Sequence, residues 1–294
     1  MARPRIAILT QPLGHNYGGL LQAYALQAYL RQLGCDVETL DRRAAGDGQM
    51  PLKGYALNFV GLALRRIKSL PTAGRRARML SELADFRNRR LTMSPRIVSD
   101  QEVRDYYRER EIDAFIVGSD QVWRPRYSPS IMNFYLDFLD DINSPAKRIA
   151  YAASFGVDIW EYSRELTEKC RRLAQKFDAI TVRERSGVLL CRDMLGVSAQ
   201  CVIDPTFLLG RGHYQSLFSA YTTSPYAGCV LSYVLDPAPH KRAIAERVEA
   251  ALGAGVLSIN PEHTFTQISA KDLEEYRLPS VESWLQAFHD ARFA

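Results

Sequence analysis

The sequence lacks the patterns that would assign it to a membrane-spanning, secreted or zinc-binding class. No window approaches the roughly 18 apolar residues that a membrane-spanning helix needs. The apolar stretch of the N-terminal MARPRIAILT is too short for a signal peptide. The five cysteines are widely spaced and form no C-x-x-C pair, which argues against a zinc site and a disulfide framework. We therefore expect a protein of the reducing cytoplasm.

Histidine is also scarce, with five residues in the chain. No two of them have the spacing that places metal ligands on one helix face, and no G-x-S-x-G or paired Cys/His signature occurs. We expect no bound metal. Only His15 lies in a loop that could bind a ligand, and a polar loop histidine is more often solvated than catalytic.

Charge is unevenly distributed along a chain of otherwise ordinary globular composition, with 47% hydrophobic and 24% charged residues. Between Lys53 and Arg96 there are eleven Lys or Arg against two acids, whereas the whole chain carries a net charge of +5. Two helix-like stretches separated by PTAG indicate a helical insertion at about 53–96. Such a segment either approaches the anionic inner face of a membrane or packs on the sheet with solvated arginines.

Strand and helix patterns alternate in the first two thirds of the chain, which predicts an α/β fold with a parallel, doubly wound sheet. We expect a Rossmann-like domain at 1–206, a linker at 207–225 and a partial second Rossmann-like domain at 226–294. The predicted strands of the first domain are short apolar runs, as in sheets covered on both faces; they are 5–10, 36–41, 113–118, 148–154, 179–183 and 200–204.

The first strand runs into a glycine-containing loop, TQPLGHNYGGLLQAY, that opens a helix. Its backbone N–H groups and the helix N-terminus suit an anionic ligand. The G-x-x-x-G-G spacing matches neither the dinucleotide nor the phosphate-loop motif, so a tight turn without a ligand is the alternative. The candidate ligand contacts are His15, Asn16, Tyr17, Gly18 and Gly19.

A second loop, GSDQVW, follows the strand at 113–118 and supplies Ser119, Asp120, Gln121 and Trp123. A carboxylate, an amide and an indole at one sheet edge suit a sugar, whose hydroxyls need polar partners and whose apolar face stacks on an aromatic ring. The alternative is that Asp120 caps the next segment and Trp123 packs in the core.

Three more strand ends carry polar residues. Ser154 ends IAYAAS, and Arg183 and Glu184 lie where AITVRERSG turns from strand to helix. An arginine there is a bidentate donor for carboxylate or phosphate, or else half of a surface ion pair. Asp204 in VIDPTF is more simply a turn residue than a catalytic one.

The ordered set NYGGLLQAYALQAYLRQLG, DAFIVGSDQVW, RIAYAASFG, FDAITVRERSG and VIDPTFLL resembles the polysaccharide pyruvyl transferase family, from about Arg5 to the last residue. The resemblance implies two Rossmann-like domains, similar to GT-B glycosyltransferases. It implies transfer of pyruvate from phosphoenolpyruvate to two hydroxyls of a sugar in a cell-surface polysaccharide or its lipid-linked precursor, forming a ketal. That scheme demands no metal or redox cofactor and no nucleic acid.

By this resemblance, the loop at Asn16–Gly18 and the GSDQVW loop form one wall of the cleft, Arg183 contacts an anion and Asp120 acts as the base. The chain ends before the S-F-H-G-type element of relatives, so we expect an incomplete second domain and a fragment without pyruvyl transfer. The alternatives are a GT-B-type glycosyltransferase that uses a sugar nucleotide, and a non-catalytic glycan-binding remnant.

Overall fold

The computed structural model describes residues 2–14, 16–45, 77–218, 224–234, 238–259 and 278–294. The chain divides into two compact units: the first is formed by Met1–Asp47 and Arg87–Leu209, the second by Gly48–Phe86 and Gly210–Ala294. His15 and most of the expected helical insertion lie outside the described residues.

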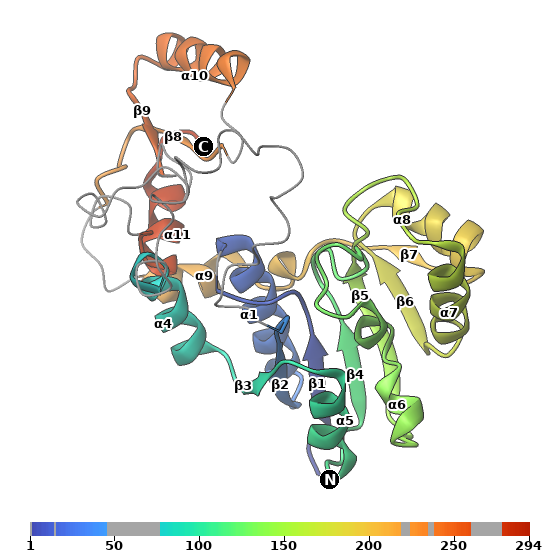
Figure 1. Ribbon diagram of the computed structural model, residues 1–294. Coiled ribbons are helices and arrows are strands. Elements are labelled where there is room, and N and C mark those ends of the chain that lie inside the picture. Colours follow the sequence, from blue (N-terminus) through green and yellow to red (C-terminus); the bar gives the residue numbers. More distant parts are fainter. Residues whose placement is uncertain (1, 15, 46–76, 219–223, 235–237, 260–277) are drawn as a thin grey trace, which may run out of the picture. The chain divides into compact units, whose positions relative to one another are not determined.

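The first unit is built on one seven-stranded parallel sheet (Figure 1). Its strand order is β3-β2-β1-β4-β5-β6-β7, so the order reverses between β1 and β4, as in doubly wound folds. The predicted α/β class is confirmed, and so are all six strands predicted for the first domain. The strands are β1 (Arg5–Leu9), β2 (Asp36–Arg42), β3 (Met93–Ile97), β4 (Ala114–Val117), β5 (Lys147–Ala153), β6 (Ala179–Val182) and β7 (Gln200–Cys201).

Strand β3 corrects the prediction that the helical insertion extends to about residue 96. Residues 93–97 pair with β2 at one edge of the sheet, with Asp41 opposite Arg96. The sequence of β3, MSPRI, has no apolar run, and its proline lacks the N–H that an inner strand would need. A strand at the edge of a sheet tolerates a proline and the lack of an apolar run, but neither feature predicts a strand from sequence. The helix before it, α4 (Ser81–Arg90), lies within the expected helical segment.

Helices cover both faces of this sheet. The buried side chains of β1 alternate: Ile6 and Ile8 pack with Leu26 of α1 (Tyr17–Gln32), while Ala7 and Leu9 belong to the cluster on the other face. That second cluster includes residues of α5 (Asp100–Arg108), η2 (Ile131–Tyr135), α6 (Phe138–Asp141) and α7 (Arg164–Ala174). The unit is completed by α8 (Arg185–Leu190), η3 (Cys191–Leu195) and η4 (Pro205–Leu208).

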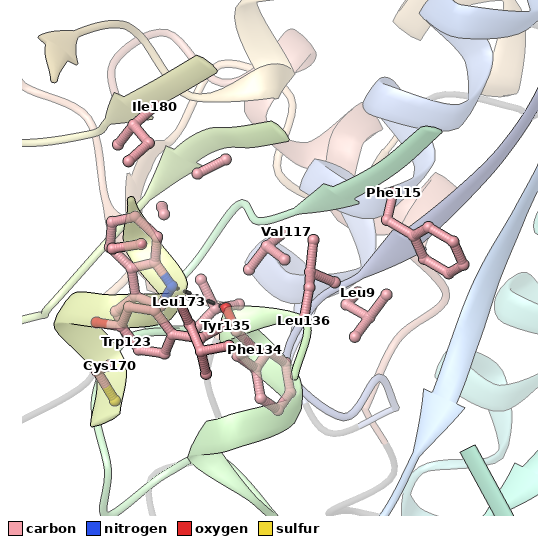
Figure 2. Packing of buried hydrophobic residues seen from close by; sticks show 14 of the residues in the cluster. Leu9, Phe115, Val117, Trp123, Phe134, Tyr135, Leu136, Cys170, Leu173 and Ile180 are labelled. Carbon is pink, nitrogen blue, oxygen red and sulfur yellow. Dashed lines mark hydrogen bonds between the residues drawn. The ribbon is translucent and has the colours of Figure 1, made fainter. Parts of the chain in front are cut away.

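Aromatic pairs tie the sheet to the helices of the second face. Phe115 of β4 makes edge contacts with Tyr107 of α5 and Phe138 of α6, at centroid separations of 4.8 and 5.4 Å. Each such pair adds about 0.5–1.5 kcal/mol beyond its buried area. Figure 2 shows Phe115 beside Leu9 and Val117 in this core. The core fixes the strand ends from which the polar loops emerge.

The second unit contains α9 (Arg211–Phe218), β8 (Val230–Ser232), α10 (Pro239–Leu252), β9 (Val256–Ser258) and α11 (Val281–Asp290). Strands β8 and β9 are parallel, and Val230 of β8 also forms a bridge with Phe293. Ser280 caps α11, because its side-chain oxygen accepts a hydrogen bond from Ser283 N at 3.0 Å. Helix α9, which packs on α11, lies within the segment expected to be a linker.

None of the described helices is long and apolar enough to cross a membrane.

Candidate functional site

The candidate residues of the first unit lie on loops at the carboxyl ends of its strands. The loop after β1 leads to Asn16, the loop after β4 holds Asp120, and β6 ends directly before Arg183. In a parallel sheet these ends share one edge, which is where open α/β folds bind ligands. The sequence-based placement of these residues at one sheet edge is therefore confirmed.

The loop after β1 is organised around the start of α1. Asn16 is the N-cap residue, and its side-chain oxygen accepts a hydrogen bond from Gly19 N. Tyr17 and Gly19 are buried and present no surface to a ligand, whereas Asn16 and Gly18 are exposed. The loop thus has the structural role of a helix cap, and Asn16 and Gly18 are the two of its described candidate residues that are exposed to solvent.

A buried glutamine joins this first loop to the second. Gln22 of α1 accepts a hydrogen bond from Ser119 N at 3.1 Å and donates to Thr10 Oγ1 at 2.8 Å. The Thr10 hydroxyl in turn donates to Ser119 O at 2.9 Å. All three residues are buried, so these bonds fix the start of the GSDQVW loop relative to α1. A glutamine on an otherwise apolar helix face is the sequence feature that indicates this buried hydrogen-bonding role.

The backbone of the second loop is tightly turned at Gly118 and Asp120. A Cβ atom on Gly118 would lie 2.1 Å from Tyr151 O, so only glycine fits there. Asp120 has a φ of 74°, in the left-handed region that non-glycine residues rarely adopt, and its Oδ1 accepts from Gln121 N at 2.8 Å. This conformation places the Asp120 carboxylate at the sheet edge with 23% of its side chain exposed.

Trp123 does not line the site: of the two interpretations of this residue, stacking on a sugar is wrong and packing in the core is correct. Its indole is fully buried and lies parallel to the Tyr135 ring, with centroids 5.1 Å apart and an interplanar angle of 8°. Its Nε1 donates to Phe134 O at 2.9 Å, the dashed bond in Figure 2. Packing in the hydrophobic core removes the large indole from water, and Trp123 thereby anchors the loop to the core.

Arg183 lies between two carboxylates that come from different strand ends. Its Nη1 is 3.3 Å from Asp204 Oδ2 and its Nη2 is 3.9 Å from Asp120 Oδ1. About a third of the Arg183 side chain is exposed, at 34%. A guanidinium in this setting is oriented by its neighbours and still accessible to an anion.

Asp204 belongs to this group, although the sequence favoured a simple turn. Its Oδ1 accepts from Thr206 N and Thr206 Oγ1 at 3.0 and 2.9 Å, which starts η4. Its Oδ2 contacts Arg183 and the hydroxyl of Ser119, the latter at 3.2 Å. The turn interpretation is therefore correct but incomplete, because Oδ1 accepts the hydrogen bonds of the turn and Oδ2 contacts Arg183 and Ser119 in the site. Ser119 is buried and acts on the site through Asp204.

Glu184 organises the loop after β5 rather than pointing away as half of a surface pair. Its Oε1 accepts from Ser154 Oγ at 2.8 Å and from Phe155 N at 3.0 Å. The Ser154 hydroxyl also accepts from Gly156 N at 2.9 Å. Ser154 is buried, so Ser154 and Glu184 together hold the loop backbone in place.

An open pocket of about 330 Å³ lies among these groups. Gly156, with a φ of 70°, lets the loop pass under Gln121, because a Cβ there would lie 2.1 Å from Gln121 Oε1. The pocket lining includes Gln121, Ser154, Gly156, Asp158, Arg183 and Glu184. It therefore combines the Arg183 guanidinium with the carboxylates of Asp158 and Glu184 and with neutral hydrogen-bonding groups. The guanidinium can contact an anion, and the carboxylates and neutral groups can accept hydrogen bonds from a polyol or donate them to it.

Comparisons with known proteins give a family match and a distant structural likeness. No curated protein matches the sequence. A solved structure that resembles it is an alpha-glucosyltransferase in complex with UDP-glucose and DNA containing an abasic site, with a TM-score of 0.38 and 10% identity. The alignment covers 79% of this chain, which spans about half the length of that structure. The family model for polysaccharide pyruvyl transferase matches residues 16–293, and the chain belongs to this family.

Proposed function

We propose that the protein transfers the pyruvyl group of phosphoenolpyruvate to two hydroxyls of a sugar in a polysaccharide or its lipid-linked precursor, forming a ketal. The observation that carries the proposal is the partly exposed Arg183 side chain at a pocket in a chain of this family. Phosphoenolpyruvate is a compact dianionic-to-trianionic donor, and a fixed guanidinium recognises carboxylate and phosphate oxygens in the bidentate manner.

The reaction sets clear chemical demands on the site. An acid protonates the methylene carbon of the donor, and the adjacent carbon then accepts the oxygen of a sugar hydroxyl whose proton a base removes. The second hydroxyl attacks the same carbon, its proton is also lost, and the carbon–oxygen bond to phosphate breaks. The products are the cyclic ketal and inorganic phosphate. Cationic groups stabilise the charge carried by the donor throughout.

We assign two of these roles to residues of the first unit. Arg183 binds an anionic group of the donor. Asp120, whose carboxylate is partly exposed 3.9 Å from Arg183 Nη2, takes a proton from the attacking hydroxyl. Asp204 and Ser119 position Arg183 and receive no direct role in the chemistry. Asn16 and Gly18, which are exposed in the segment after β1, are assigned as further contacts of the donor.

The test compares the donor of the proposed reaction with the donor of the alternative, a sugar nucleotide. Thermal unfolding of the chain is followed with phosphoenolpyruvate, with UDP-glucose and with inorganic phosphate as an anion control. We expect phosphoenolpyruvate to raise the melting temperature more than phosphate does at equal concentration, and UDP-glucose to have no effect. Stabilisation by UDP-glucose without stabilisation by phosphoenolpyruvate would replace the proposal with a glycosyltransferase that uses a sugar nucleotide.

A further inference from the structure

The loop that buries Trp123 exposes a different aromatic residue four positions later. Tyr127 is 52% exposed, and the Arg124 guanidinium lies over its ring with Cζ 4.7 Å from the centroid. One face of the ring is therefore covered by the cation, which leaves the exposed area on the rest of the ring. An exposed aromatic ring beside a polar pocket is the arrangement in which a sugar finds an apolar surface and hydrogen-bonding partners together.

The arginine that covers this ring is held by an ion pair with two hydrogen bonds. Arg124 Nε and Nη2 donate to the two carboxylate oxygens of Glu161 at 2.9 and 3.1 Å. These hydrogen bonds also hold the pKa of Glu161 below its usual value, so the carboxylate stays charged. The backbone adds a turn, in which Tyr127 N donates to Arg124 O at 3.0 Å. A ring held in this way loses little conformational freedom when it binds a ligand.

The same arginine connects the ring to the pocket. Arg124 Nη1 donates to Gln121 Oε1 at 3.2 Å, and Gln121 lines the pocket together with Arg183. The Gln121 side chain packs against Gly156 on the pocket wall. The contacts Tyr127–Arg124–Gln121 thus form a continuous path from the exposed ring to the wall of the pocket that Arg183 also lines.

We propose that Tyr127, held by Arg124 and Glu161, is the stacking surface for a pyranose ring of the acceptor. The inference rests on the proposed function, because it places the acceptor next to the donor at Arg183. The apolar C–H face of the pyranose covers the Tyr127 ring, and its hydroxyls are directed to the polar groups around Gln121. A phenylalanine at this position would keep the stacking surface, and an alanine would remove it.

Saturation-transfer difference NMR tests the proposal with methyl β-D-glucopyranoside, methyl β-D-galactopyranoside and methyl α-D-mannopyranoside as probes. At least one probe should receive saturation from the wild-type chain on its ring protons. We expect Tyr127→Ala to reduce this signal at least fivefold and Tyr127→Phe to retain most of it. Glu161→Gln, which removes the charge that holds Arg124 against the ring, should give an intermediate signal. Leu33→Ala, at another exposed large apolar side chain, directly after α1, is the control and should leave the signal unchanged.

Three results would overturn the inference: no saturation transfer from the wild-type chain to any of the pyranosides, equal transfer in wild type and Tyr127→Ala, or competition by uridine at lower concentration than the sugars. Calorimetry with phosphoenolpyruvate separates this outcome from the fate of the proposed function. If Tyr127→Ala loses the sugar signal and the wild-type chain does not bind phosphoenolpyruvate, the stacking surface stands and the donor assignment fails. If phosphoenolpyruvate binds and the sugar signal is insensitive to Tyr127, the reverse holds.

Discussion

The guanidinium of Arg183 and the carboxylate of Asp204 lie 3.3 Å apart, although 21 residues separate them in the chain. The fold brings them together because β6 and β7 are parallel neighbours whose carboxyl ends share one edge. The pair orients the arginine, and it also places a negative charge where an anionic donor would approach. Asp204 therefore orients the Arg183 guanidinium and also competes with an anionic donor for it.

Replacing Asp204 by asparagine separates these two effects. Asp204→Asn keeps an oxygen for Thr206 and removes the negative charge beside Arg183. Because both side chains are partly exposed, we expect a moderate gain, about threefold to tenfold in affinity for phosphoenolpyruvate at low salt, that shrinks as salt is added. Titration calorimetry at two salt concentrations measures it. A loss of affinity would mean that orientation of Arg183 outweighs charge competition.

Gln22 gives a prediction about stability. Gln22→Met has a similar volume, but it removes the acceptor of the buried Ser119 N and the hydrogen bond that Thr10 Oγ1 accepts. We expect the free energy of unfolding to fall by about 1–3 kcal/mol. Urea denaturation monitored by tryptophan fluorescence reports it, since Trp123 lies in the same unit. Gln32→Met, on the exposed end of the same helix, is the control and should change stability by less than about 0.5 kcal/mol. Equal effects of the two changes would show that the Gln22 bonds do not support the loop.

The cysteines should differ sharply in reactivity. Burial raises the pKa values of Cys170 and Cys191 to about 12, whereas Cys201 is exposed on the edge strand β7. Because the thiolate is the reactive form, alkylation at pH 8 should modify Cys201 first and leave Cys170 and Cys191 protected until the chain unfolds. Mass spectrometry of timed digests shows the order. Early modification of Cys170 would contradict the core packing of α7.

Asp140 of α6 should contribute stability that depends on pH. Burial alone would raise its pKa, but hydrogen bonds from Lys176 and Arg148 outweigh it and hold the pKa below the usual value. A lowered carboxyl pKa stabilises the fold above the unfolded-state value, about 3.9, and this contribution is lost as the pH falls through the folded-state pKa. We expect Asp140→Asn to cost about 0.5–1 kcal/mol at pH 7, a small value because the side chain is 36% exposed to screening solvent.

Denaturation curves of wild type and Asp140→Asn at pH 7 and pH 3 give the required comparison. The difference between the two proteins should shrink at the lower pH. A difference that stays constant, or grows, would assign the effect to packing instead of charge.

The regular part of the fold was predictable because it depends on local patterns. Apolar runs such as that of β4, with four buried residues in succession, indicate strands covered on both faces. Strand β3 was missed because MSPRI contains neither an apolar run nor an alternation, and it is held by its pairing with β2. Pairing between distant segments leaves no trace in a local pattern.

The site was predictable in its location and less so in the roles of its residues. Arg183 and Asp120 were identified because charged side chains directly follow strands. The two interpretations of Trp123 stayed open because sequence cannot tell which aromatic residue of a loop faces the core; the structure buries Trp123 and exposes Tyr127. Asp204 was undervalued because its contact with Arg183 depends on the register of β6 and β7.

The central claim is that Arg183 binds the anionic donor, and calorimetric titration with phosphoenolpyruvate tests it most directly. The wild-type chain should bind, and Arg183→Ala should weaken binding by about 1.5–3 kcal/mol, the cost of a charge-assisted hydrogen bond. Arg183→Lys should restore only part of the affinity, because lysine lacks the bidentate guanidinium. Equal affinity for phosphoenolpyruvate in the wild type and in both variants would contradict the account and leave Arg183 with a purely structural role beside Asp204.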